Sequence, residues 1–175
     1  MRLTALLCLL AAAAAAAAAA RNADAQAAPT APKFEIGMDA SLAYQLSDPN
    51  SFVASIPVSR VRAGVFMTPL ISLEGSLGLV YIHADGRNFS NINGGAGLLF
   101  HLSSAGPVQP YIRPLFEWDA NLGSGGSTGQ YGGGLGIGTK LRIGARVAAR
   151  IEGAFVSLGG ESSLVAYTGL SWFVK

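Results

Sequence analysis

Residues 33–47, KFEIGMDASLAYQLS, alternate between apolar and polar side chains over almost their whole length. One set of alternate positions holds Phe34, Ile36, Met38, Ala40, Leu42, Tyr44 and Leu46. Polar or small residues fill the positions between them. Successive side chains of a β-strand point to opposite faces of the sheet, so a period of two residues is typical of a strand. The stretch therefore predicts a strand with one apolar face and one polar face.

The same alternation returns along the chain, separated by turn-forming segments such as 48–51 and 85–88. We expect eight strands, at residues 33–47, 57–68, 71–83, 92–103, 110–121, 130–141, 145–157 and 164–174. Large apolar residues recur at intervals of 37, at Tyr44, Tyr81, Trp118 and Phe155. This spacing predicts four hairpins of equal length. Pro114 has no N–H to give to a ladder, so the fifth strand is expected to carry a bulge or to begin late there.

The first 27 residues have the layout of a secretory signal peptide. Arg2 precedes an apolar stretch at 3–20, and small residues at Ala23, Ala25 and Ala27 suit a cleavage site. We therefore expect residues 1–27 to be removed and residues 28–175 to form one domain. The sole cysteine, Cys8, would leave with the signal, so disulfides and thiolate metal sites are not expected.

The composition decides which way the apolar face points. Charged residues make up only 13% of the chain, against about 25% in a typical soluble domain. With the apolar face inward, as in a lipocalin-like ligand binder, the outer surface would hold too few charges. With it outward, strands of this length suit a hydrocarbon layer, and closure pairs every backbone edge. The sequence predicts an all-β, eight-stranded antiparallel up-and-down transmembrane β-barrel.

The polar face then fills the lumen, and at eight strands side chains leave no wide pore. Buried charges are costly unless paired, so an internal ion-pair network with a structural role is expected. Its members are Glu35, Asp39, Arg60, Arg62, Glu74, Arg113, Glu117, Arg150 and Glu152. Asp119, Lys140 and Arg146 share the polar face. Glycines 97, 132, 134, 136 and 138 are expected to make room for the long arginine side chains.

Outward aromatic residues gather at the ends of the expected strands. Tyr44, Tyr81, Trp118 and Phe155 fall at one rim, and Phe34, Phe100 and Trp172 at the other. Amphipathic rings favour the two membrane interfaces, so these residues predict two aromatic girdles.

Two segments, VFMTPLISLE at 65–74 and GLSWFVK at 169–175, resemble those of the small eight-stranded outer-membrane barrels of the OmpA/OmpX-like group. The resemblance implies an outer-membrane location in a Gram-negative-type bacterium, with both termini in the periplasm. Loops 48–56, 84–91, 121–129 and 158–163 would then face outward. Outer-membrane lipid and the barrel-assembly machinery are the implied partners, and the extracellular partner stays open. The last strand departs from the group's usual terminal aromatic residue, because Val174 and Lys175 follow Phe173.

The preferred function is a structural or surface-interaction role, without enzyme activity and without a cofactor. Balanced charge, with 12 Lys and Arg against 10 Asp and Glu, gives no basic face for nucleic acid. His83 and His101 are too few and too far apart for a metal site. One alternative is a lipid A acyl hydrolase, because lipid A deacylases carry a His-x-Ser pair, which His101 and Ser103 match, and Glu117 is an acid that would orient the histidine. The other is a soluble, lipocalin-like periplasmic ligand binder.

Overall fold

The computed structural model describes residues 32–46, 52–84, 87–123 and 126–174, and the side chains at 52–59, 80–89, 122, 123, 126 and 127 are not described. The expected signal peptide at 1–27 lies outside the described residues. Within the described ranges no helix is long and apolar enough to cross a membrane.

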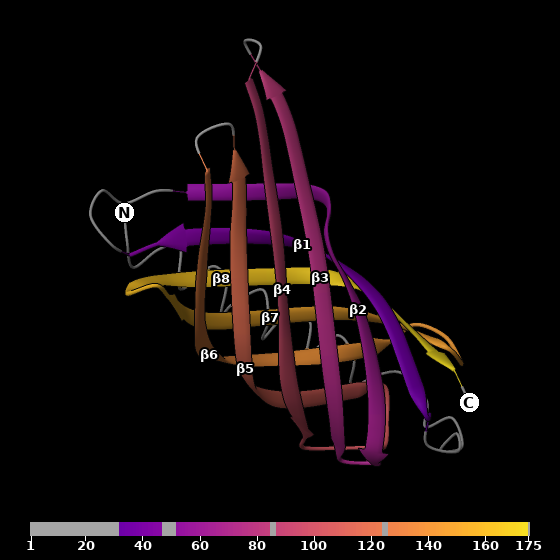
Figure 1. Ribbon diagram of the computed structural model, residues 1–175. Helices are drawn as coiled ribbons and strands as arrows, with labels where there is room; N and C mark the ends of the chain where they lie inside the picture. The colour runs from indigo at the N-terminus through magenta and orange to yellow at the C-terminus, as the bar shows by residue number, and fades with distance from the viewer. Residues whose placement is uncertain (1–31, 47–51, 85–86, 124–125, 175) are drawn as a thin grey trace.

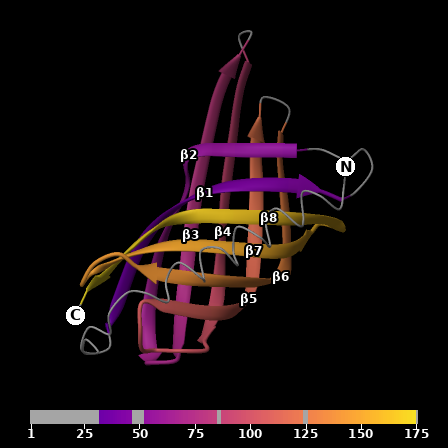
Figure 2. The same cartoon turned by 180° about the vertical axis from the view of Figure 1, so that it is seen from behind.

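Eight antiparallel strands form one closed barrel in simple sequence order (Figures 1 and 2). The strands are β1 (Phe34–Gln45), β2 (Phe52–Thr68), β3 (Ile71–Ala84), β4 (Arg87–His101), β5 (Val108–Gly123), β6 (Gly126–Arg142), β7 (Val147–Leu158) and β8 (Glu161–Val174). Each strand pairs with the next, and β8 pairs with β1 from Phe34↔Val174 to Gln45↔Ser163. The predicted eight-stranded, up-and-down antiparallel barrel is thus confirmed.

Several strands are longer than the sequence predicted, at the end of the barrel away from the termini. Residues 52–56, 87–91, 121–123 and 126–129 were expected in loops, but they lie in strands. The β3–β4 ladder continues to Ala84↔Arg87, and the β5–β6 ladder to Gly123↔Gly126. These two hairpins project beyond their neighbours in Figure 1. The residues of these hairpins that the sequence pattern missed, 87–91, 121–123 and 126–129, are rich in Gly, Asn and Ser and lack the apolar alternation.

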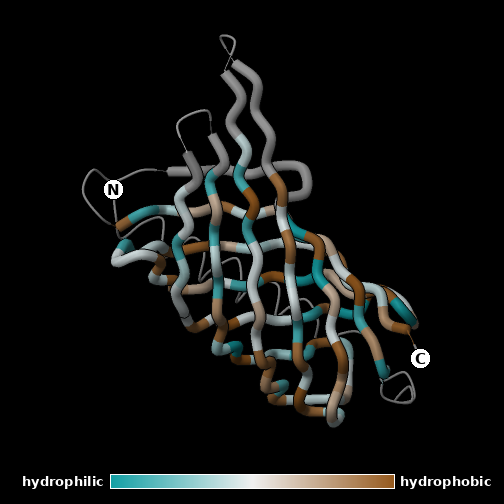
Figure 3. The backbone as a smooth tube through the Cα atoms, in the orientation of Figure 1, coloured by the Kyte–Doolittle hydropathy of each residue, from teal (hydrophilic) through white to brown (hydrophobic). Residues whose placement is uncertain are grey.

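The apolar face of the sheet points outward. Leu42, Leu79, Phe116 and Leu135 are 38%, 66%, 49% and 50% exposed on the outer surface. The largest fully buried side chains include Arg150, Lys140 and Glu152, the reverse of a soluble core. Figure 3 shows apolar and polar residues alternating along the strands. The barrel is therefore apolar outside and charged inside, as the composition indicated.

Prolines affect the ladders differently from the prediction. The bulge or late start expected at Pro114 is wrong, because β5 runs through it and Pro114 pairs with Leu135 on β6. The β4–β5 ladder keeps one register on both sides, from Gly97↔Leu115 to Phe100↔Ile112. The missing N–H is tolerated because the ladder with β4 has no pair at Pro114 itself. A true break occurs in β2, where Asp39↔Arg60 is followed by Ser41↔Ser55.

Candidate functional site: the ion-paired lumen

Ten ionisable side chains from six of the strands fill the barrel interior. All are at most 9% exposed. The acids are Glu35, Asp39, Glu74, Glu117 and Glu152, and the bases are Arg60, Arg62, Arg113, Lys140 and Arg150. Each side chain belongs to the inward parity of its strand, so the two-residue period delivers all of them to one space.

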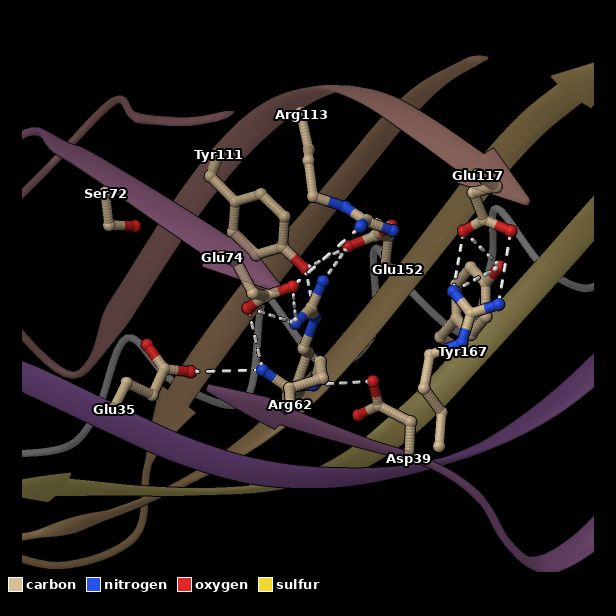
Figure 4. A network of polar contacts seen from close by, with 12 residues as sticks. Glu35, Asp39, Arg62, Ser72, Glu74, Tyr111, Arg113, Glu117, Glu152 and Tyr167 are labelled. Atoms are coloured by element: carbon tan, nitrogen blue, oxygen red, sulfur yellow. Dashed lines mark hydrogen bonds and ion pairs between the residues drawn. The ribbon is translucent and has the colours of Figure 1, made fainter. Parts of the chain in front are cut away.

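Glu74 of β3 is the centre of the network (Figure 4). Arg150 Nη1 donates to both carboxylate oxygens of Glu74, at 2.9 and 2.8 Å. Arg62 Nη1 donates to Glu74 Oε2 at 2.9 Å, and Arg113 Nη1 lies 3.8 Å from Oε1. One carboxylate from β3 thus ties together guanidinium groups from β2, β5 and β7.

Glu152 of β7 forms a second centre beside the first. Arg113 Nε donates to its Oε1 at 3.0 Å, and the Tyr111 hydroxyl donates to its Oε2 at 2.6 Å. Arg150 Nη2 also contacts Glu152, while Arg150 Nε donates to the Tyr111 hydroxyl at 2.7 Å. Tyr111 therefore links a cation and an anion through one oxygen, which polarises both hydrogen bonds.

Glu35 and Asp39 of β1 anchor the network near the end that holds the termini. Lys140 Nζ of β6 pairs with Glu35, and Arg62 forms ion pairs with Glu35 and with Asp39, the latter at 2.6 Å. The Lys140 ammonium also lies 5.6 to 6.0 Å from the ring centroids of Tyr111, Phe66 and Phe173. These aromatic faces stabilise a desolvated cation.

Arg60 and Glu117 form a separate pair toward the other end. The guanidinium donates to both carboxylate oxygens, at 2.6 and 3.1 Å, and also to Asn93 Oδ1 at 3.4 Å. Its Cζ lies 5.2 Å from the centre of the Tyr167 ring, whose hydroxyl donates to Glu117 at 3.3 Å. Two-point pairing of this kind fixes both side chains.

Charges in this interior balance, with five acids against five bases among the described buried residues. Breaking one partner out of a buried pair costs about 3–5 kcal/mol, because the other charge is left uncompensated. The contacts join strands on opposite sides of the barrel, as in the link from Glu35 on β1 to Lys140 on β6. The arrangement therefore fills the lumen with fixed, neutralised charge.

The nine residues that the sequence assigned to the lumen are all among these ten. The tenth is Lys140, which the sequence also placed on the polar face, and the structure adds the hydroxyl groups of Tyr111 and Tyr167. Arg146 was placed on the same polar face, which is wrong, because it is exposed in the turn between β6 and β7. Asp119 lies inward but accepts hydrogen bonds from Asn91 and Asn121, at 2.7 and 3.2 Å.

Gly97 shows how small residues make space for the network. A Cβ at this position would lie 2.9 Å from Cγ and Cδ of Arg113, which is closer than real side chains approach. This agrees with the expectation for Gly97. Gly136 and Gly138 instead face Glu152 and Tyr111, and Gly132 and Gly134 face the β7 backbone, so these four do not make room for arginines.

The expected girdle residues lie on the outer face where they are described. Phe34, Phe100, Trp118, Phe155 and Trp172 are 37 to 48% exposed, and Tyr44 is half-buried. The side chain of Tyr81 lies outside the described residues. Tyr131, which was not among the predicted girdle residues, is 75% exposed and pairs across the ladder with Trp118.

His101 does not form the pair on which the hydrolase alternative depended. Its ring points inward and its Nε2 lies 3.0 Å from Ser72 Oγ. The Ser103 hydroxyl instead donates to the carbonyl of Ala105 at 2.9 Å. His101 also stacks on Phe66 at 5.4 Å between centroids. In the described part of the chain, no group of three or more His, Cys, Asp or Glu residues is arranged to hold a metal ion.

The chain has the fold of the small eight-stranded outer-membrane barrels. Neither a protein-family profile nor a curated protein matches the sequence. Among solved structures, it is similar to Neisserial surface protein A, with TM-score 0.58 and 16% identity over 79% of this chain and 96% of that one. The attachment invasion locus protein Ail of Yersinia pestis matches with TM-score 0.55 and 11% identity, over 82% and 99%. The N-terminal β-barrel domain of Pseudomonas aeruginosa OprF gives 0.51 and 15%, over 79% and 96%.

Proposed function

We propose that this protein is an integral outer-membrane barrel with a structural role in the cell envelope, and that ion pairs close its lumen. The observation that carries the proposal is the inversion of polarity, with charged side chains buried inside and apolar side chains exposed on the outer surface. Such an outer surface matches a hydrocarbon layer. The proposal also includes export by a signal peptide at residues 1–27, outer-membrane lipid as the surrounding solvent, and insertion by the barrel-assembly machinery.

Current through planar bilayers tests the closed lumen. The protein is expected to carry no steady current of the size that a wide aqueous pore gives, because each of the five buried cations already contacts a carboxylate. The envelope role is tested separately by deleting the gene and measuring the permeability of cells to detergent. A steady large conductance would contradict the closed lumen, and an unchanged permeability barrier would contradict the structural role.

A surface-interaction role is the second candidate, and the two extended hairpins favour it. Near their bases, Asn91 Nδ2 donates to Asp119 at 2.7 Å and to Asn121 at 2.9 Å, which braces β4 against β5. A braced polar projection is suited to contact outside the cell. Cells that produce the protein and cells of a deletion strain should then differ in attachment to surfaces, and equal attachment counts against this role.

A further inference from the structure

The wall of the barrel has an open seam between β2 and β3. Their ladder runs from Thr68↔Ile71 to Val61↔Leu77 and goes no further. Beyond that point β3 continues to Ala84 with β4 as its only ladder partner, and the first part of β2 pairs only with β1. Figures 1 and 2 both show the start of β2 running beside β1 while β3 continues upward with β4.

The break in β2 explains the seam. Residues 56–59 have no partner on β1, because the register jumps from Asp39↔Arg60 to Ser41↔Ser55. Pro57 lies in this interval; a proline has a fixed φ and no N–H to donate, so it interrupts a ladder. Arg60 and Gly78, the next residues after the last pair, are not paired with each other. The seam is thus built into the strand and is not a frayed end.

An open cavity of about 630 Å³ lies at the end of the β2–β3 ladder, where the seam begins. Its apolar wall includes Val61, Leu77 and Leu79, which are 54%, 58% and 66% exposed on the outer face. Its inner side includes Arg60 and Ser76, which belong to the lumen parity. This volume lies within the usual range for small-molecule sites, and the lining is apolar with a few polar groups, as such sites are.

We propose that this seam binds one acyl chain of a lipid from the surrounding bilayer. The mouth opens on the apolar outer surface, so the medium that reaches it is the membrane itself, if the proposed membrane setting is correct. Val61, Leu77 and Leu79 line this mouth with apolar side chains, and a hydrocarbon chain gains dispersion contacts with such side chains.

The seam fits a lipid better than it fits a second barrel. Above Val61 and Leu77, the backbone N–H groups of the two strand edges have no ladder partner on the other strand. Backbone donors at membrane depth need acceptors. A lipid carries ester oxygens and a hydrocarbon chain in one molecule, which matches a polar inner side and an apolar wall. In this assignment the hydrocarbon chain packs against Leu77 and Leu79, and the ester end faces the unpaired backbone edges.

Native mass spectrometry of the protein purified from membranes tests the assignment, with dimyristoyl phosphatidylethanolamine as the probe. Gly75 lines the cavity, and a Cβ there meets nothing closer than 4.0 Å, so the backbone accepts a side chain at this position and Gly75→Trp is the variant designed to fill the cavity. Gly153→Trp is the matched control, because Gly153 is an exposed strand glycine with nothing within 4 Å of its Cβ position. Both variants are checked for folding by their migration on unheated gels.

Wild type and Gly153→Trp are expected to retain one lipid through detergent exchange, and Gly75→Trp is expected to lose at least about tenfold in affinity. Leu79→Ser, which removes part of the apolar wall, is expected to bind several-fold more weakly, and it keeps the assignment testable if Gly75→Trp does not fold. Equal retention in all variants, or no retained lipid in wild type, overturns the proposal. So does a wild-type dimer that Gly75→Trp separates, since the occupant would then be a second copy. If wild type retains no lipid while the barrel stays membrane-bound and non-conducting, the assignment of the seam is wrong and the proposed function stands. If the protein is found in the soluble fraction, the proposed function itself is contradicted.

Discussion

Replacing Glu74 by glutamine removes the carboxylate that holds three arginines at the centre of the lumen. Arg62 and Arg150 would lose charge-assisted hydrogen bonds of 2.8 to 2.9 Å, and Arg113 its ion-pair partner at 3.8 Å. The network would change from five acids and five bases to a net charge of +1. Because Glu74 is 3% exposed, water cannot compensate. We expect a loss of about 3–5 kcal/mol in the free energy of unfolding, the cost of orphaning a buried charge.

Urea unfolding in lipid vesicles, followed by tryptophan fluorescence, measures this loss. Trp118 and Trp172 both lie on the outer face, so their emission reports departure from the lipid. Glu161→Gln is the control, since Glu161 is exposed and contacts only Gln45 among the described hydrogen bonds; an exposed polar contact is worth under about 1 kcal/mol. A Glu74→Gln protein no less stable than this control would refute the assignment of the ion pairs as stabilising contacts.

Three further substitutions probe the lumen, its glycine and the outer wall by the same unfolding assay. Lys140→Met should cost about 3 kcal/mol, because Glu35 would keep only its longer ion pair with Arg62 at 3.3 Å, even though a methionine fits the aromatic surroundings; unchanged stability would show that the lysine is not needed. Gly97→Val should cost about 1–3 kcal/mol through overpacking against Arg113, whereas Gly153→Val, with open space around it, should cost less; equal losses would argue against close packing in the lumen. Ile137→Arg, at a site 64% exposed, should destabilise the barrel in bilayers by up to about 4 kcal/mol, and no effect in bilayers would contradict lipid contact there.

Alternation along the strands was enough to predict the barrel and the contents of its lumen. The run from Phe34 to Leu46 shows why, because a strict period of two assigns each side chain to one face. The low content of charged residues then indicated that the apolar face of the sheet is the outer one. The same parity places Tyr111 and Tyr167 inside, but aromatic residues on a polar face carry no signal until their hydroxyl partners are known.

The exact ends of the strands and their irregularities were harder to predict from the sequence. Residues 87–91, 121–123 and 126–129, in the outer parts of β4 to β6, are rich in Gly, Asn and Ser, so no periodicity separates them from loops, and only backbone pairing defines them. The two prolines have different effects on strand pairing. The ladder between β5 and β6 continues through Pro114, whereas the register between β1 and β2 shifts around Pro57. Arg146 was misassigned because β7 begins at Val147, one residue after it.

Site-directed spin labelling along β8 in lipid bilayers tests most directly whether the apolar rows face lipid and the polar rows face a filled lumen. Single cysteines, in a Cys8→Ser background, would be placed at Leu164, Thr168 and Leu170 on the exposed parity and at Tyr167 and Ser171 on the buried one. Labels on the first set should be relaxed by dissolved oxygen, which concentrates in hydrocarbon, and labels on the second set should be shielded from both oxygen and a water-soluble reagent. Relaxation of the second set by oxygen, with the first set open to the water-soluble reagent, would contradict the account.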